Sequence, residues 1–383
     1  MTSLHEVLKA HVDDGSMPGA VGLVAHGDRV EAAVVGSVDT EGTAPMARDT
    51  IFRLASVTKP ITTAAAMTLI DDGTIALEDL VAPWLPELAD PTVVRIPEAA
   101  VDDAVPADRG ITVEDLLSFR AGYGFPSDFS LPAVQPLFSE LKGPLMPQAV
   151  PAPDEWMARL AGIPMLRQPG EAWLYNTCSD ILGVLIARAS GQPLPEFLAE
   201  RLFEPLGMTD TAFSVPARKL GRFTSSYRAG ADGALAVVDA PDGEWSSPPA
   251  FPSAAGGLVS TADDLLAFGR MLLAGGTVDG RETLSADSVR RMTTDHLTRA
   301  QREASGLFLE GQGWGYGGAV DVAAVEPWNE PGRYGWVGGT GTSWHITPST
   351  GTVAVLLTQR EMPGPSGPDS MRAFWRYAAG PGS

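Results

Sequence analysis

The stretch Phe52-Arg53-Leu54-Ala55-Ser56-Val57-Thr58-Lys59-Pro60 is the part of the sequence around which the rest of the chain is organised. If the segment is helical, Ser56 and Lys59 face the same side one turn apart, so that hydroxyl and amine can share a proton. A serine is a weak nucleophile near neutral pH without an adjacent base, and a lysine in a dry pocket can lose its proton and become that base. The two residues also occur at this spacing by chance, with the lysine simply solvated, so the surrounding sequence has to distinguish the two cases.

Composition and charge exclude several classes of protein. The 383 residues are enough for two domains, and a hydrophobic content of 44% is typical of a soluble globular protein. The formal charge of −20 disfavours nucleic acid and anionic membranes as partners. No run approaches the ~18–20 apolar residues that a membrane span needs.

The cysteine content and the first residues bear on the cellular location. The single cysteine, Cys178, allows no intrachain disulfide and fits a reducing compartment. Residues 1–6 lead directly into a helical pattern, without the basic start and apolar segment of a signal peptide. We therefore expect a cytoplasmic protein, and the sequence gives no prediction of its oligomeric state.

Strands are expected at both ends of the chain and helices between them. Apolar periodicity predicts helices over residues 3–13, 56–72, 180–190, 194–203, 261–273 and 369–378, and a capping box predicts another that opens at Thr112. Strands are predicted over 19–26, 29–36, 314–322, 334–337, 343–347 and 352–359, the first two joined by a hairpin turn at Gly27-Asp28. Residues 77–213 are mainly helical in pattern, whereas 125–153 and 228–252 resemble long ordered loops.

This order of elements predicts the fold class. Sequential hairpins favour an antiparallel sheet, into which the helical middle is inserted. We expect an α/β (α+β) protein with a sheet domain made from residues 1–76 and 214–383 and an all-helical domain from 77–213. The active site is expected in the cleft between the two domains.

Several common chemistries lack their sequence signatures. The chain has no Gly-x-Ser-x-Gly elbow, no His-Glu-x-x-His and no Gly-Lys pair of a P-loop. One cysteine and five scattered histidines make a zinc site improbable, so that neither metal nor cofactor is expected. The glycine-rich segment 311–318 predicts a strand in close contact with a neighbour. His345 is interpreted as an ordinary satisfied histidine and Cys178 as a packing thiol.

Six short blocks, in this order, carry a resemblance to a known superfamily. They are Leu54–Lys59, Ile111–Leu117, Gln168–Tyr175, Glu204–Met208, Ala255–Asp264 and Gly313–Gly317. Together they resemble the serine β-lactamase/penicillin-binding-protein superfamily, and most closely the class C β-lactamase-like esterases of the family VIII carboxylesterase type. The similarity runs from about residue 19 to residue 359. It implies a DD-peptidase/β-lactamase-like fold.

The resemblance also implies a catalytic set. Ser56 would be the acylated nucleophile, and Lys59 and Tyr175 would move protons. Either Tyr175, with its pKa lowered by the lysine charge, or Lys59 itself would accept the serine proton. The backbone amides of Ser56 and Gly339 would form the oxyanion hole, in which one donor is typically worth ~10²–10³ in turnover.

Two departures from the β-lactamase pattern favour an esterase. In β-lactamases the strand near the site begins Lys-Thr-Gly and holds the carboxylate of the antibiotic, whereas this chain has Trp336-Val337-Gly338. The β-lactamase asparagine that contacts the acyl amide, two residues after the tyrosine, is replaced by Thr177. Both changes weaken recognition of a β-lactam and leave acyl transfer intact.

The resemblance further suggests which residues touch the substrate. Trp336, Gly338, Thr177, Tyr123 and Phe125 are the candidate substrate-binding residues. Other aromatic residues fall in segments that line the family's cleft, and some are expected to form an apolar pocket: Phe119, Phe129, Trp156, Trp245, Phe251 and Trp328.

The function expected from the resemblance is hydrolysis of a small-molecule carboxylic ester through an acyl-serine, without metal or cofactor. An acyltransferase differs only in the acceptor of the acyl group. The alternative within enzymes is a β-lactamase or a D-amino-acid peptidase or amidase. A more distant alternative is a non-catalytic sensor with the same fold, although Ser56, Lys59 and Tyr175 are all present.

Overall fold

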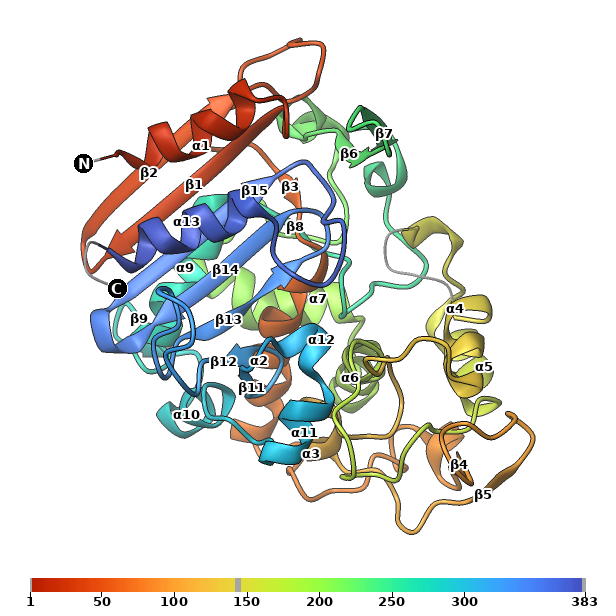
Figure 1. Cartoon of the computed structure of the whole chain (residues 1–383). Coiled ribbons are helices and arrows are strands. Elements are labelled where there is room, and N and C mark those ends of the chain that lie inside the picture. Colours follow the sequence, from red (N-terminus) through yellow and green to blue (C-terminus); the bar gives the residue numbers. More distant parts are fainter. Residues whose placement is uncertain (1, 142–145, 381–383) are drawn as a thin grey trace.

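The centre of the molecule is one antiparallel sheet built from both ends of the chain. The computed structural model describes residues 2–141 and 146–380. The seven strands lie in the spatial order β11-β12-β13-β14-β15-β1-β2 (Figure 1). Their bounds are β1 (Gly19–His26), β2 (Arg29–Gly36), β11 (Gly313–Trp314), β12 (Ala319–Val320), β13 (Tyr334–Gly338), β14 (Thr342–Thr347) and β15 (Thr352–Thr358).

Helices cover both faces of this sheet. On one face α1 (Leu4–Asp13) and α13 (Asp369–Ala379) pack on each other and on the strands (Figure 1). Leu4, Leu8 and Phe374 form a buried cluster there with Leu356 of β15. On the other face α9 (Ala262–Leu273) and α2 (Thr58–Asp71) contact the sheet. The expected antiparallel sheet flanked by helices is therefore confirmed.

The middle of the chain is mainly helical, as expected. Its helices are α3 (Val113–Leu117), α4 (Gln135–Ser139), α5 (Pro153–Ala161), α6 (Thr177–Ser190), α7 (Leu194–Leu198), a π-helical turn at Ala199–Phe203 and α8 (Glu204–Leu206). The expected capping box at Thr112 is present. The segments outside this middle part add α10 (Ala286–Met292), α11 (Arg299–Ala304), α12 (Gly306–Leu309) and the strand pairs β3 (Phe52–Arg53)–β8 (Val259–Ser260) and β9 (Thr277–Val278)–β10 (Arg281–Glu282).

Several expected elements are wrong. Residues 314–322 are not one strand: β11 and β12 form a tight hairpin, with Gly317 at a φ of 71° between them. The expected loop 228–252 contains most of a hairpin, β6 (Ser226–Ala229) and β7 (Leu235–Asp239). The expected helical segment contains the hairpin of β4 (Thr92–Val94) and β5 (Ala104–Pro106). The expected loop 125–153 contains α4, and residues 142–145 of it lie outside the described residues.

The apolar core does not divide at the expected domain boundaries. Its largest buried cluster includes Leu116 and Leu182 from the middle of the chain and Leu265 and Leu357 from the sheet side. The division into residues 1–76 plus 214–383 and 77–213 stays a prediction. Among the described residues, no helix has the length and apolar character needed to cross a membrane.

Candidate active site

Ser56 lies in a strained turn that leads into α2. The 3₁₀ turn Ala55–Val57 continues directly into that helix, and Ala55 has a φ of 45°. A non-glycine residue rarely adopts this left-handed conformation, which persists only when the surrounding structure holds it. Here the hydroxyls of Thr340 and Thr342 donate hydrogen bonds to the carbonyl oxygens of Arg53 and Leu54, both at 2.7 Å.

These hydrogen bonds bring the end of β13 against the turn that carries Ser56. A Cβ atom at Gly338 would overlap the carbonyl oxygen of Leu54, so only glycine allows the two backbones to approach this closely. At Gly339 an added Cβ would meet no heavy atom within 4 Å, which means that this residue borders open space. Gly338 therefore lies against the turn that carries Ser56, whereas the part of Gly339 in an oxyanion hole stays a prediction.

Lys59 is fully buried in the first turn of α2. Its Nζ donates to three oxygens: Ser56 Oγ at 2.9 Å, Asn176 Oδ1 at 2.8 Å and the carbonyl of Ala255 at 2.6 Å. An ammonium group has three donors, so these acceptors fix its position. Lys59 is therefore not a solvated lysine in the first turn of the helix.

Burial controls the charge of this lysine. Removal from water disfavours the ammonium form and lowers the pKa of Lys59 to about 7, while the negative charge of Asp180 opposes that shift. Asp180, on α6, is itself buried, and burial raises its pKa. Its Oδ1 accepts from Ser253 Oγ at 2.8 Å and from the amide of Ala255 at 3.0 Å. The carboxylate thus holds the backbone segment whose carbonyl binds Lys59.

Tyr175 completes the group from the other side. Its backbone exchanges two hydrogen bonds of 2.9 Å with Phe125, and its hydroxyl accepts from Trp336 Nε1 at 2.7 Å. Its ring centroid lies 4.8 Å from Lys59 Nζ. Burial raises the pKa of Tyr175 to about 12, although hydrogen bonds with Ser56 and Trp336 oppose the rise. A pKa lowered by the lysine charge, as considered from the sequence, is not what the structure gives.

Asn176 is a site residue that the sequence did not indicate. It has φ 80° and ψ −63°, and the amide of Thr177 donates to the carbonyl of Tyr175 at 3.2 Å, which defines a γ-turn. This turn places the side-chain amide of Asn176, rather than the side chain of Thr177, against Lys59 Nζ. Thr177 is the buried first residue of α6, and its proposed contact with substrate stays a prediction.

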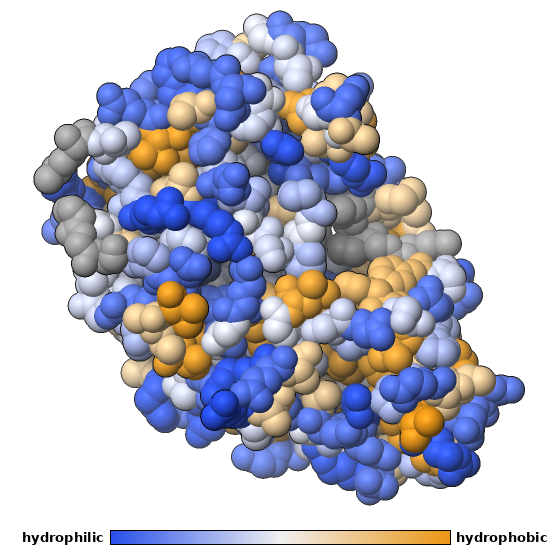
Figure 2. All heavy atoms as spheres, in the orientation of Figure 1, coloured by the Kyte–Doolittle hydropathy of each residue, from blue (hydrophilic) through white to orange (hydrophobic). Residues whose placement is uncertain are grey.

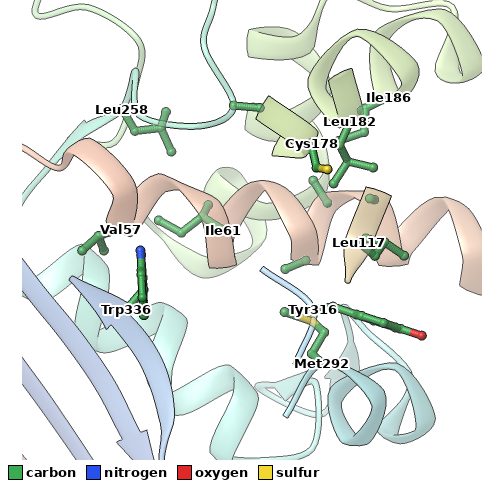
Figure 3. Close-up of a cluster of buried hydrophobic side chains, with 14 of the residues drawn as sticks. Val57, Ile61, Leu117, Cys178, Leu182, Ile186, Leu258, Met292, Tyr316 and Trp336 are labelled. Carbon is green, nitrogen blue, oxygen red and sulfur yellow. The ribbon is translucent and has the colours of Figure 1, made fainter. Parts of the chain in front are cut away.

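The side chains around α2 form a continuous apolar wall. Figure 3 shows Val57 of the 3₁₀ turn and Ile61 of α2 near Trp336, with Cys178 and Leu182 of α6 beside the next turns of α2. Cys178 is buried, with its Sγ 3.6 Å from the carbonyl of Tyr123, as expected of a packing thiol. His345 is buried beside Ser343, and burial holds its pKa well below the usual range.

The expected aromatic pocket is only partly assembled. Phe119 and Phe125 lie next to Tyr175, whereas Tyr123 is buried in the core. Two of the six candidates lie in other apolar clusters: Trp328 packs on Trp375 of α13, and Trp245 packs near Arg53. Trp156 packs against Phe251, with the two rings tilted. Phe129 instead contacts Phe308, an aromatic residue that was not singled out in the sequence.

The charged side chains suggest no alternative metal-dependent centre. In residues 2–141 and 146–380, no group of three or more histidine, cysteine, aspartate or glutamate side chains could hold a metal ion. What the site does combine is a hydroxyl, a lysine amine with a lowered pKa, a tyrosine phenol and an indole donor. This set can activate a hydroxyl and move its proton.

Known proteins resemble the chain over nearly its whole length. Protein Rv1367c of Mycobacterium tuberculosis is 40% identical over 365 residues, which cover 91% of this chain and 87% of the relative. Esterase EstB of Burkholderia gladioli is 32% identical over 376 residues, covering 91% of this chain and 88% of the relative.

Solved structures give the same result. The structure of EstCE1, described as a hydrolase with promiscuous acyltransferase activity, superposes with a TM-score of 0.80 and 26% identity. The superposition covers 97% of this chain and 96% of EstCE1. The family model described as Beta-lactamase matches residues 4–374. The chain therefore belongs to the β-lactamase family of serine enzymes and related esterases.

Proposed function

We propose that the protein is a serine hydrolase that cleaves small-molecule carboxylic esters through an acyl group on Ser56. The observation that carries the proposal is the buried Lys59 amine, which lies 2.9 Å from Ser56 Oγ and has its pKa lowered to about 7. Near neutral pH a large part of this lysine is unprotonated and able to accept the serine proton. The esterase and hydrolase names of the relatives EstB and EstCE1 support the same chemistry.

Lys59 is the proposed base in the first step. Ser56 Oγ attacks the ester carbonyl carbon while its proton passes to Lys59 Nζ, and the carbonyl oxygen takes the negative charge. A Tyr175 phenolate would be the alternative acceptor, but with a pKa of about 12 the phenol holds its proton. The backbone amides of Ser56 and Gly339 are the proposed donors to the oxyanion.

Tyr175 is the proposed proton donor to the departing alcohol. As the tetrahedral intermediate collapses, the carbon–oxygen bond to the alcohol breaks and the alkoxide takes the phenol proton. The proton held on Lys59 then restores the phenol. Trp336 keeps the Tyr175 hydroxyl oriented through its 2.7 Å hydrogen bond. In the second half of the reaction, water attacks the acyl-serine in the same way and releases the carboxylic acid. An alcohol or amine that attacks in place of water gives acyl transfer.

An ester substrate is favoured over a β-lactam. Trp336 and Val337 are uncharged and cannot form an ion pair with the carboxylate of a β-lactam. The indole N–H of Trp336 already donates a hydrogen bond to the Tyr175 hydroxyl. We expect efficient turnover of short-chain p-nitrophenyl esters and slow turnover of a chromogenic cephalosporin. Rapid cephalosporin hydrolysis with poor ester turnover would favour the β-lactamase alternative instead. Turnover of peptides and amides of D-amino acids should likewise be slow compared with turnover of the esters.

A covalent probe separates an enzyme from a non-catalytic sensor of the same fold. A fluorophosphonate should label the protein once, at Ser56, and the Ser56→Ala variant should remain unlabelled. Ser118→Ala is a matched control, because Ser118 is buried and bonded to the backbone of α3. An unlabelled wild-type protein would support the sensor. The cytoplasmic location is part of the proposal, supported by the single Cys178.

A further inference from the structure

Four phenylalanine rings form a continuous strip that begins at Tyr175. The Phe308 ring centroid lies 4.7 Å from that of Tyr175, and Phe129 lies 5.9 Å from Phe308. The Phe129 ring centroid lies 6.1 Å from that of Phe138 and 6.0 Å from that of Phe125. Phe125 and Phe138 stack on each other, with their centroids 4.6 Å apart. We call Phe125, Phe129, Phe138 and Phe308 the phenylalanine strip.

The outer end of the strip is open to solvent. Phe129 is 37% exposed and Phe138 is 49% exposed, and Leu307, next to Phe308, is 36% exposed. Figure 2 shows apolar residues on the surface over α12 and, opposite them, beside α4 and α5. Exposed large apolar side chains that adjoin one another are uncommon unless they bind something. This exposed surface is continuous with the aromatic ring of a proposed catalytic residue.

The strip joins two parts of the chain that are far apart in sequence. Phe308 belongs to α12, whereas the other three rings come from residues 125–138. Ser127 Oγ donates to the carbonyl of Ala304 at 2.9 Å, which fixes the two segments together. The rings are thus held in place before a substrate arrives, so a ligand need not order them.

The position of Tyr175 decides which half of an ester meets the strip. If its phenol protonates the departing oxygen, the group attached to that oxygen lies beside the Tyr175 ring and hence beside Phe308. We infer that the phenylalanine strip binds the alcohol portion of the ester and selects aromatic or bulky apolar alcohols, both as leaving groups and as acyl acceptors. This inference rests on the proposed function, because it uses the acyl-Ser56 mechanism.

Two substrate pairs test it. Ethyl butyrate and benzyl butyrate share the acyl group and differ in the alcohol, while ethyl phenylacetate places the aromatic ring on the acyl side. We expect kcat/KM for benzyl butyrate to exceed that for ethyl butyrate by about tenfold, as for one well-placed aromatic contact. Ethyl phenylacetate should show a much smaller gain over ethyl butyrate. Transfer of butyryl groups to benzyl alcohol should likewise exceed transfer to ethanol.

Variants at the exposed end connect this preference to the strip. Phe129→Ala and Phe138→Ala should each lower kcat/KM for benzyl butyrate by about three- to tenfold, mainly through KM, and change ethyl butyrate less than about twofold. Phe138→Leu keeps the apolar volume without the ring and serves if the alanine variants fold poorly. Leu80→Ala removes an exposed apolar side chain elsewhere, 50% exposed, and should leave both esters unaffected.

The possible outcomes separate this inference from the proposed function. If the wild type hydrolyses esters but does not prefer benzyl butyrate, or if the variants affect both butyrates equally, the inference is overturned and the proposed function stands. A selective loss on ethyl phenylacetate would place the strip on the acyl side and would also overturn it. If no ester of either kind is hydrolysed, the proposed function fails and the inference fails with it.

Discussion

The lowered pKa of Lys59 leads to the most quantitative prediction. With a pKa of about 7, the amine is about 90% unprotonated at pH 8 and about 1% unprotonated at pH 5, whereas an ordinary lysine is less than about 1% unprotonated at pH 8. Because only the unprotonated amine accepts the Ser56 proton, the acylation rate should rise with pH and level off above about pH 8. The sign follows from the role of a base, which must lose its own proton first.

Nuclear magnetic resonance can observe this titration directly. The chain has four lysines, so protein labelled with ¹³C at the lysine ε carbon should give a resolvable spectrum, and Lys59→Met assigns the signal. We expect one lysine to titrate near pH 7, and single-turnover acylation by a p-nitrophenyl ester to follow the same midpoint. A Lys59 midpoint near 10, or an acylation rate that does not depend on pH between 5 and 8, would refute the assignment of Lys59 as the base.

A second variant tests the physical cause of that pKa. The negative charge of Asp180 favours the ammonium form of Lys59 and so raises its pKa, against the larger effect of burial. Asp180→Asn removes the charge and keeps a similar shape. The Lys59 midpoint and the rise in acylation rate should therefore both move to lower pH in this variant. A shift to higher pH would contradict the account.

Two further predictions concern the surroundings of the site. Trp336→Phe keeps an aromatic ring but removes the hydrogen-bond donor to the Tyr175 hydroxyl. Because an unpaired buried polar group costs about 1–3 kcal/mol, kcat for ester hydrolysis should fall by about tenfold or more. The circular-dichroism spectrum should be unchanged. Gly338→Ala forces a methyl group into the carbonyl oxygen of Leu54 and should lower kcat/KM by about a hundredfold or more, whereas Gly364→Ala, where an added Cβ meets no atom within 4 Å, should leave it unchanged. Normal kinetics in Trp336→Phe, or in Gly338→Ala, would show that the corresponding contact has no part in catalysis.

The sheet was predictable from the sequence wherever local signals agreed. The turn at Gly27-Asp28 lies between two runs of strand-forming residues, and β1 and β2 pair in the expected register. The segment 314–322 was mispredicted because its apolar residues suggest one strand. Gly317, with its positive φ, lies in the turn that reverses the chain there. The sequence alone does not indicate this turn, because the pairing of β11 with β12 is seen only in the structure.

The proximity of the proposed catalytic residues was predictable for a different reason. Ser56 and Lys59 lie one helical turn apart, so the spacing alone brings them together. Asn176 could not be predicted, because its contact with Lys59 depends on a strained γ-turn that only the folded structure maintains. The phenylalanine strip was predicted only in part, through Phe125 and Phe129, for a similar reason. Phe308 lies more than a hundred residues beyond Phe129 in the chain, and no local pattern relates them.

The acyl-serine itself is the central claim, and mass spectrometry tests it most directly. Wild-type protein mixed with p-nitrophenyl butyrate and quenched in acid within the first turnover should gain the mass of one butyryl group. Peptide mapping should place that group on Ser56, and Ser56→Ala should gain nothing. A butyryl group on another residue, or ester hydrolysis that continues in Ser56→Ala, would contradict the account.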